Sequence, residues 1–156
     1  MNSYDLENAF YLHLSGFPYM NFVTLKPTEV KEPPDGPWRR GWVLLGEPET
    51  IGFGNGVYSR TEGIYQIDLY VPLFQESALR VLRGATDAHV TRFWPANSRG
   101  LTLERNGTEA HILRRPNQRH LSYGGQATNA PNSREGAFLR AIVEVDFFVE
   151  HYPNGG

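Results

Sequence analysis

The sequence has 156 residues, a length that fits one domain whose core is large enough to need no disulfide bonds. It contains no cysteine, which excludes a disulfide framework, a zinc finger and a cysteine nucleophile. Its 15 basic and 17 acidic side chains give a net charge of -2, so the chain has no overall positive field to attract nucleic acid.

The distribution of apolar residues predicts a soluble, folded protein. Hydrophobic residues make up 40% of the chain, which argues against disorder, and no apolar run approaches the ~20 residues of a membrane helix. The first residues show no basic region followed by an apolar block. We therefore predict no signal peptide and a cytosolic location.

The first predicted element is a helix that starts at Tyr4. Ser3 can act as its N-cap, and Asp5 lies in the first turn, where the helix dipole favours a negative charge. Gly16 ends the helix and Pro18 prevents its continuation. The predicted apolar face consists of Leu6, Ala9, Phe10 and Leu14.

Two strand candidates and two loops follow. Residues 20–25 form a short strand candidate that is apolar on both sides, and residues 26–37 contain four prolines, which predict a loop or an extended arm. Residues 38–45 predict a second strand. Residues 46–60 predict a long loop, which leads into the next strand.

The strand at residues 65–71 organises the rest of the prediction. Its even positions Gln66 and Asp68 are polar, the period-two pattern of a half-buried sheet. Pro72 ends the strand because it has no N–H to donate, and from Ser77 the apolar spacing changes to that of a helix covering the sheet. The odd positions of the strand are Tyr65, Ile67, Leu69 and Val71, and the helix stripe comprises Ala78, Val81, Leu82, Ala85, His89 and Phe93.

The last third of the chain predicts a hairpin, a loop and a central strand. Residues 101–104 can pair with residues 110–113 across Asn106-Gly107, a strong turn dipeptide. Residues 116–136 are polar and rich in glycine and proline, so they predict a long loop. Residues 139–149 alternate regularly and should lie in the middle of the sheet. We expect a single α+β domain over residues 1–156: one mainly antiparallel sheet with two helices packed on one face, plus the hairpin and long loops.

No residue pattern indicates catalysis, a cofactor or a metal. The glycines at residues 52–56 lack the flanking strand, helix and lysine of a phosphate loop, and the five histidines are scattered singly. No serine sits in a nucleophile elbow. Glu144 and Asp146 share one strand face and are expected to be solvated. We therefore predict that the protein is not an enzyme.

Arginines next to aromatic residues form the one binding signal. Such residues grip phosphate and stack on bases, which suits nucleic acid, but they are also enriched in protein interfaces, which the near-neutral charge favours. The candidate assembly interface comprises Arg39, Arg40, Trp42, Phe53, Tyr58, Arg114, Arg115, Arg119, Tyr123 and Arg134. The alternative is a nucleic-acid-binding module using Arg39, Arg40, Arg114, Arg115 and Arg119. A small hydrolase of unrecognised type is a third.

The order of these elements resembles the phage tail terminator-like family, which includes the tail-tube terminators and minor tail proteins of siphophages. The resemblance covers nearly the whole chain. It is carried by the helix around Leu6-Glu7-Asn8-Ala9-Phe10, the proline-rich segment before the strand at 38–45, and the string Gly63-Ile64-Tyr65-Gln66-Ile67-Asp68-Leu69-Tyr70-Val71-Pro72. A helix, a hairpin and a strand ending near residues 147–151 complete it.

The resemblance implies an α+β structural protein of the virion with no chemistry of its own. It implies a homo-oligomeric ring, usually a hexamer, that caps the last tail-tube ring, ends tube polymerisation and joins the tail to the head connector. The implied partners are therefore further copies of the chain, the tail-tube protein and the head-tail connector protein, without a membrane and with DNA at most passing through the lumen. The implied location is the neck end of the tail, reached from the host cytoplasm during assembly.

Overall fold

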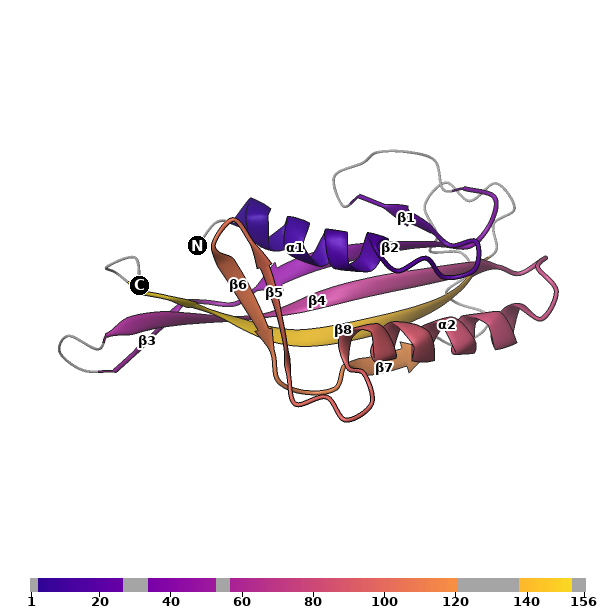
Figure 1. The fold of residues 1–156 in the computed structure, drawn as a ribbon. Coiled ribbons are helices and arrows are strands. Elements are labelled where there is room, and N and C mark those ends of the chain that lie inside the picture. The colour runs from indigo at the N-terminus through magenta and orange to yellow at the C-terminus, as the bar shows by residue number, and fades with distance from the viewer. Residues whose placement is uncertain (1–2, 27–33, 53–56, 121–137, 153–156) are drawn as a thin grey trace.

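The computed structural model describes residues 3–26, 34–52, 57–120 and 138–152. These residues form two helices and one eight-stranded sheet with the strand order β1-β2-β4-β8-β6-β5, in which β3 also pairs with β4 and β7 with β8 (Figure 1). All strand pairs are antiparallel except β1 with β2. The predicted α+β class with a single, mainly antiparallel sheet is confirmed.

The elements in chain order are α1 (Ser3–Ser15), β1 (Val23–Leu25), β2 (Trp38–Leu45), β3 (Glu49–Ile51), β4 (Tyr58–Pro72), α2 (Ala78–Phe93), β5 (Leu101–Arg105), β6 (Thr108–Ile112), β7 (Asn117–His120) and β8 (Phe138–His151). The sequence predicted α1, β2, α2, the β5–β6 hairpin and β8 almost to their ends. The hairpin turns at Asn106 and Gly107, whose φ angles of 51° and 86° are those that its tight turn requires.

The strands β4 and β8 form a long antiparallel ribbon at the centre of the sheet. Their pairing runs without interruption from Ser59 opposite His151 to Pro72 opposite Phe138. β8 has β4 on one side and β6 and β7 on the other, so its predicted central position is confirmed. Because strand side chains alternate between faces, the odd-numbered residues of both strands lie on one side of the ribbon and the even-numbered residues on the other.

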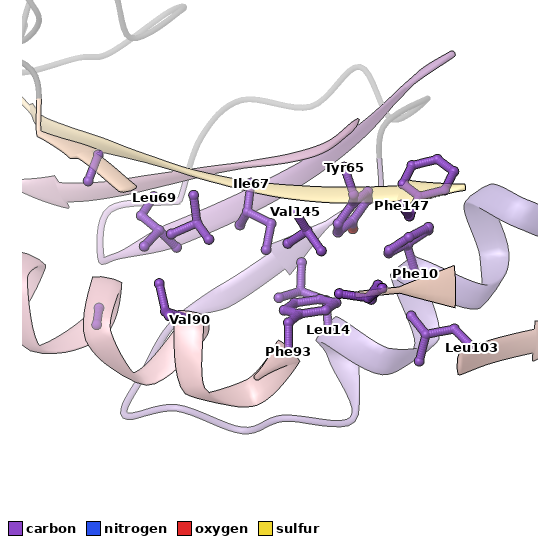
Figure 2. Packing of buried hydrophobic residues seen from close by; sticks show 14 of the residues in the cluster. Phe10, Leu14, Tyr65, Ile67, Leu69, Val90, Phe93, Leu103, Val145 and Phe147 are labelled. Carbon is purple, nitrogen blue, oxygen red and sulfur yellow. The ribbon is translucent and has the colours of Figure 1, made fainter. Parts of the chain in front are cut away.

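The main core lies on the odd-numbered face. Buried residues of both helices join Tyr65, Ile67 and Leu69 of β4 and the odd positions of β8 in one cluster. The ring of Phe10 stacks on that of Tyr65 at 4.4 Å between centroids, and Figure 2 shows Phe10 and Phe93 facing the sheet. Both helices therefore contribute to one shared cluster.

A second, smaller cluster lies on the even-numbered face. The ring of Trp38 stacks on Tyr70 with 4.0 Å between centroids, and Leu25 and Phe138 complete the group. These four side chains are almost fully buried, with exposed fractions between 1% and 6%. One end of this face is therefore part of the interior.

Three short elements depart from the prediction. Residues 20–22 are not part of a strand, because Met20 adopts a left-handed φ of 47° and only Val23–Leu25 pairs with β2. The predicted loop 46–60 contains β3 and the start of β4, with which β3 pairs, so β4 begins at residue 58 and not at residue 65 as predicted. Residues 117–120 of the predicted loop 116–136 form β7 on β8, and residues 121–136 of that prediction lie outside the described residues.

Candidate interaction surface

The even-numbered face of the central ribbon carries the candidate site. It is opposite the main core, and the strand register places polar side chains of β2, β4 and β8 next to one another. Arg40 lies opposite Asp68, and Asp68 opposite Ile142. β7 adds Arg119, which lies opposite Ile142 from the other edge of β8.

Ion pairs cross this face between neighbouring elements. Each joins an arginine to a carboxylate of β4 or β8, and the more exposed pairs, those of Arg114 and Arg119, contribute about 0 to 1 kcal/mol each. Their nitrogen–oxygen distances are 3.3 Å for Arg60–Glu150, 3.1 Å for Arg114–Asp146, 2.9 Å for Arg119–Glu144 and 3.2 Å for Arg140–Asp68. The face is therefore locally neutralised, and both Glu144 and Asp146 are engaged with arginines.

Beyond the small cluster, the same face opens into a groove of about 590 Å³, here called the sheet groove. Leu44, Leu45 and Leu113 border it and are exposed by 52%, 38% and 62%. Neither the ion pairs nor the core covers these three leucines. The remaining lining residues are Gly46, Arg60, Glu62, Gly63, Ile64, His111, Arg114, Asp146, Phe147 and Phe148.

Arg40 and Trp42 lie on this face, as the candidate interface requires. The guanidinium of Arg40 sits 5.5 Å from the ring centre of Trp38 and 5.4 Å from that of Trp42, both within cation–π range. The indole nitrogen of Trp42 donates to an oxygen of Asp68 at 3.3 Å. Both side chains are half-buried, so they reinforce the sheet as well as contribute to its surface.

Arg39 does not belong to the interface, and this prediction is wrong. It is 1% exposed and points toward the helices, on the opposite side of β2 from Arg40. Its Nε donates to the Thr24 hydroxyl at 2.7 Å. Its terminal nitrogens donate to the carbonyl oxygens of Leu14 at 3.0 Å and Phe17 at 2.5 Å, and to Nε2 of His89 at 2.6 Å. The Arg39 side chain thus connects the end of α1 to α2 through hydrogen bonds to Leu14 and His89.

Burial shapes the electrostatics around Arg39. Burial lowers the pKa of Arg39 to about 10, so the guanidinium is still protonated at neutral pH. The pKa of His89 is lowered to about 4, mainly by burial. The hydrogen bond to the Ala85 carbonyl raises this pKa, whereas the positive charge of Arg39 lowers it. Since Arg39 must donate, neutral His89 accepts through Nε2 and donates from Nδ1 to Ala85 at 2.6 Å.

The remaining candidates are divided. Tyr58 begins β4, where its ring stacks on Tyr152 at 5.0 Å between centroids. Arg114, Arg115 and Arg119 are exposed, and Arg114 and Arg119 form the ion pairs described above. Phe53, Tyr123 and Arg134 lie outside the described residues. The structure thus gathers Arg40, Trp42, Arg114 and Arg119 on one face.

The sequence analysis missed the exposed leucines that border the sheet groove. Leu44 and Leu45 end β2, and Leu113 follows directly after β6. For Leu44 and Leu45, two adjacent leucines at the end of a strand, directly before Gly46, could have indicated that one of them lies on the outer face of the sheet. Within the described residues, no three histidine, aspartate or glutamate side chains gather to hold a metal ion, and no helix is long and apolar enough to cross a membrane.

Comparison with known proteins adds evidence for the fold. No family model and no curated protein matches the sequence. One solved structure aligns over 98% of this chain and 99% of its own, with a TM-score of 0.67 and 14% sequence identity, and its name states no function. That likeness shows the fold.

Proposed function

We propose that the protein is a structural subunit of a phage tail that assembles as a ring, caps the tail tube and joins it to the head connector. The sequence resemblance suggests this function. The observation that carries the proposal is the sheet groove, because a groove bordered by three exposed leucines is a feature of surfaces that bind another protein.

The groove also has the composition of a protein interface. Arg60 lies 4.4 Å from the ring centre of Phe148, and Arg114 is 75% exposed beside Leu113. Arginine and aromatic residues are enriched in the centre of protein interfaces. The partners in this proposal are neighbouring copies of the chain, the tail-tube protein and the connector protein.

The competing proposal, a nucleic-acid-binding module, is less favoured by the geometry. Arg39 is buried, and Arg114 and Arg119 already neutralise carboxylates of β8. Phosphate binding depends on arginines whose charge is free to replace counterions. Apart from buried Arg39, only Arg40 and Arg115 of the predicted basic patch lack such a carboxylate partner among the described residues.

Sedimentation velocity and negative-stain images of the purified protein, alone and with tail tubes, test the proposal. We expect closed rings, or rings on tube ends, for the wild type. The double variant Leu44→Asp/Leu113→Asp should remain folded but lose this assembly, because it places charges in the groove. Met20→Asp is the matched control, since Met20 is 64% exposed outside the groove.

Two outcomes would reject the proposal. The first is a wild-type monomer at tens of micromolar that also ignores tail tubes. The second is tight, salt-sensitive DNA retention on filters that is lost in an Arg114→Ala/Arg115→Ala/Arg119→Ala variant while assembly is unchanged, which would establish the nucleic-acid-binding module instead.

A further inference from the structure

The two ends of the long ribbon differ in their exposed charges. At one end, β3 and the start of β4 project beyond the helices (Figure 1). At the other end, β4 leads through a short connection into α2 (Figure 1). The ribbon therefore separates two surfaces of different character.

The first surface, here called the acidic end, comprises the exposed Glu47, Glu49 and Glu62 with Leu44 and Leu45. None of these three glutamates forms an ion pair with a described residue. Leu44 and Leu45 are partly exposed beside them. Arg60 lies opposite Glu49 but is paired with Glu150, so this end presents an excess of negative charge around an apolar contact.

The second surface, here called the helix groove, is an open hollow of about 800 Å³ at the start of α2. Its lining contains Arg80 and Arg83, which are exposed and form no ion pair with a described residue. The other lining residues are Leu73, Gln75, Ser77, Ala78, Leu79 and Gly84, none of which is acidic. Exposed Phe74 adjoins the lining residue Leu73 and adds apolar surface.

The backbone of α2 adds to the positive charge of this groove. Ser77 precedes the helix in a left-handed conformation and makes no side-chain cap, and the first turn contains no acidic residue. The first amide groups of a helix carry partial positive charge. Glu76 and Asp87 are exposed nearby but do not line the groove. A carboxylate entering the groove is thus met by positive groups.

We infer that the acidic end of one copy docks into the helix groove of the next copy. The occupant is a second copy because both complementary surfaces belong to the same chain and lie at opposite ends of it, so every copy can offer one and receive the other. Contact between two different surfaces is heterologous, and its repetition closes a ring when the rotation permits. The inference rests on the proposed ring function and identifies the contact between its subunits.

Charge reversal tests the contact on each side. We expect Glu47→Arg/Glu49→Arg and Arg80→Glu/Arg83→Glu each to raise the dissociation constant of self-association by about tenfold or more, because like charges then face each other. Arg99→Glu/Arg105→Glu is the matched control, since both arginines are exposed away from the two surfaces. Circular dichroism and a urea unfolding curve check that each variant is folded.

Two combinations of the charge-reversal variants should restore self-association. In the quadruple variant each contact again joins opposite charges, so self-association should return. An equimolar mixture of the two double variants should also assemble, because each reversed surface finds its complement on the other chain. Restored assembly in the mixture would be difficult to obtain if either double variant were merely misfolded.

The outcomes separate this inference from the proposed function. Rings that form equally well in both double variants would overturn the inference and leave the ring function intact. Loss of tail-tube binding with unchanged self-association would assign the surfaces to another protein and also overturn it. A wild-type protein that is monomeric under every condition would reject both.

Discussion

At the scale of single residues, Arg39 and His89 are the most informative pair in the structure. A buried guanidinium is costly unless its donors are satisfied, and here the Arg39 donors meet carbonyl oxygens, a hydroxyl and an imidazole nitrogen. Arg92 makes a second link between α2 and the end of α1, because its Nε and one terminal nitrogen donate to the His13 carbonyl oxygen at 3.1 Å and 3.0 Å. Positive charge near the last carbonyls of α1 is also favoured by the helix dipole.

This pair predicts a pH dependence of stability. The pKa of His89 is lowered from 6.5 to about 4 in the folded protein, so between these values the unfolded chain binds a proton that the folded chain does not. Its contribution is present above pH 6.5 and is lost as the pH falls toward 4, at about 1.4 kcal/mol per pH unit. His89→Gln keeps an acceptor for Arg39 without titrating, so its stability should fall less steeply.

Urea unfolding between pH 7 and pH 4 measures this difference. Exposed His151→Gln is the control and should follow the wild type. Parallel pH curves for the wild type and His89→Gln would contradict the assignment of His89 as the titrating group.

A second residue-scale prediction concerns Gly41. A Cβ added to Gly41 would overlap the Tyr65 hydroxyl group, and Tyr65 is held in the core by its stack on Phe10. Gly41→Ala should therefore lower the free energy of unfolding by about 1 to 3 kcal/mol through overpacking. In contrast, a Cβ added to Gly36 has no neighbour within 4 Å among the described residues, so Gly36→Ala should change the free energy of unfolding little. Equal effects of the two substitutions in urea titrations would disprove the close approach.

At the scale of elements, the alternation of β4 decides which side chains are in the core. Leu69 is 0% exposed, so Leu69→Ala should cost about 2 to 5 kcal/mol. Gln66 lies on the other face and donates to an oxygen of Asp68 at 3.0 Å, so Gln66→Ala should cost about 1 kcal/mol. Thermal and urea unfolding measure both. A larger loss for Gln66→Ala would mean that the two faces are reversed.

The sequence predicted the elements whose signal is local. The alternation of β4 and β8, the apolar stripe of α2 and the Asn106-Gly107 turn are all visible within a short window of residues. β3 and β7 were missed because segments of three and four residues have no measurable period, and they become strands only by pairing with long neighbours.

The site was harder to predict than the fold. Arg39 was predicted in the interface with Arg40 because both are arginines next to tryptophans, although its position in the alternation of β2 matches that of Gly41 and Val43, which face the core. The alternation of side chains along β2 would have placed Arg39 in the core, as the structure does. The sheet groove could not be predicted, because it depends on how β2, β4, β6 and β8 lie beside one another.

At the scale of the whole molecule, the fold depends on a strand from the end of the described chain. β8 pairs with β4, β6 and β7, so a chain that stops at residue 137 should show no cooperative unfolding transition. A chain shortened only to residue 152 is the control, since it keeps every described pairing. Circular dichroism during heating distinguishes the two. A cooperative transition in the shorter chain would show that β8 is dispensable.

The central position of β8 also has a consequence for synthesis in the cell. During translation, β4 leaves the ribosome long before β8 is synthesised. Until then, the edge of β4 that pairs with β8 is unpaired and its core-facing side chains are incompletely covered. Pairing of such distant segments is also slow once the chain is released. A newly made copy therefore passes through a stage in which its longest strand is open to pairing with other unfinished chains, and chaperones that bind extended apolar segments would protect it at that stage.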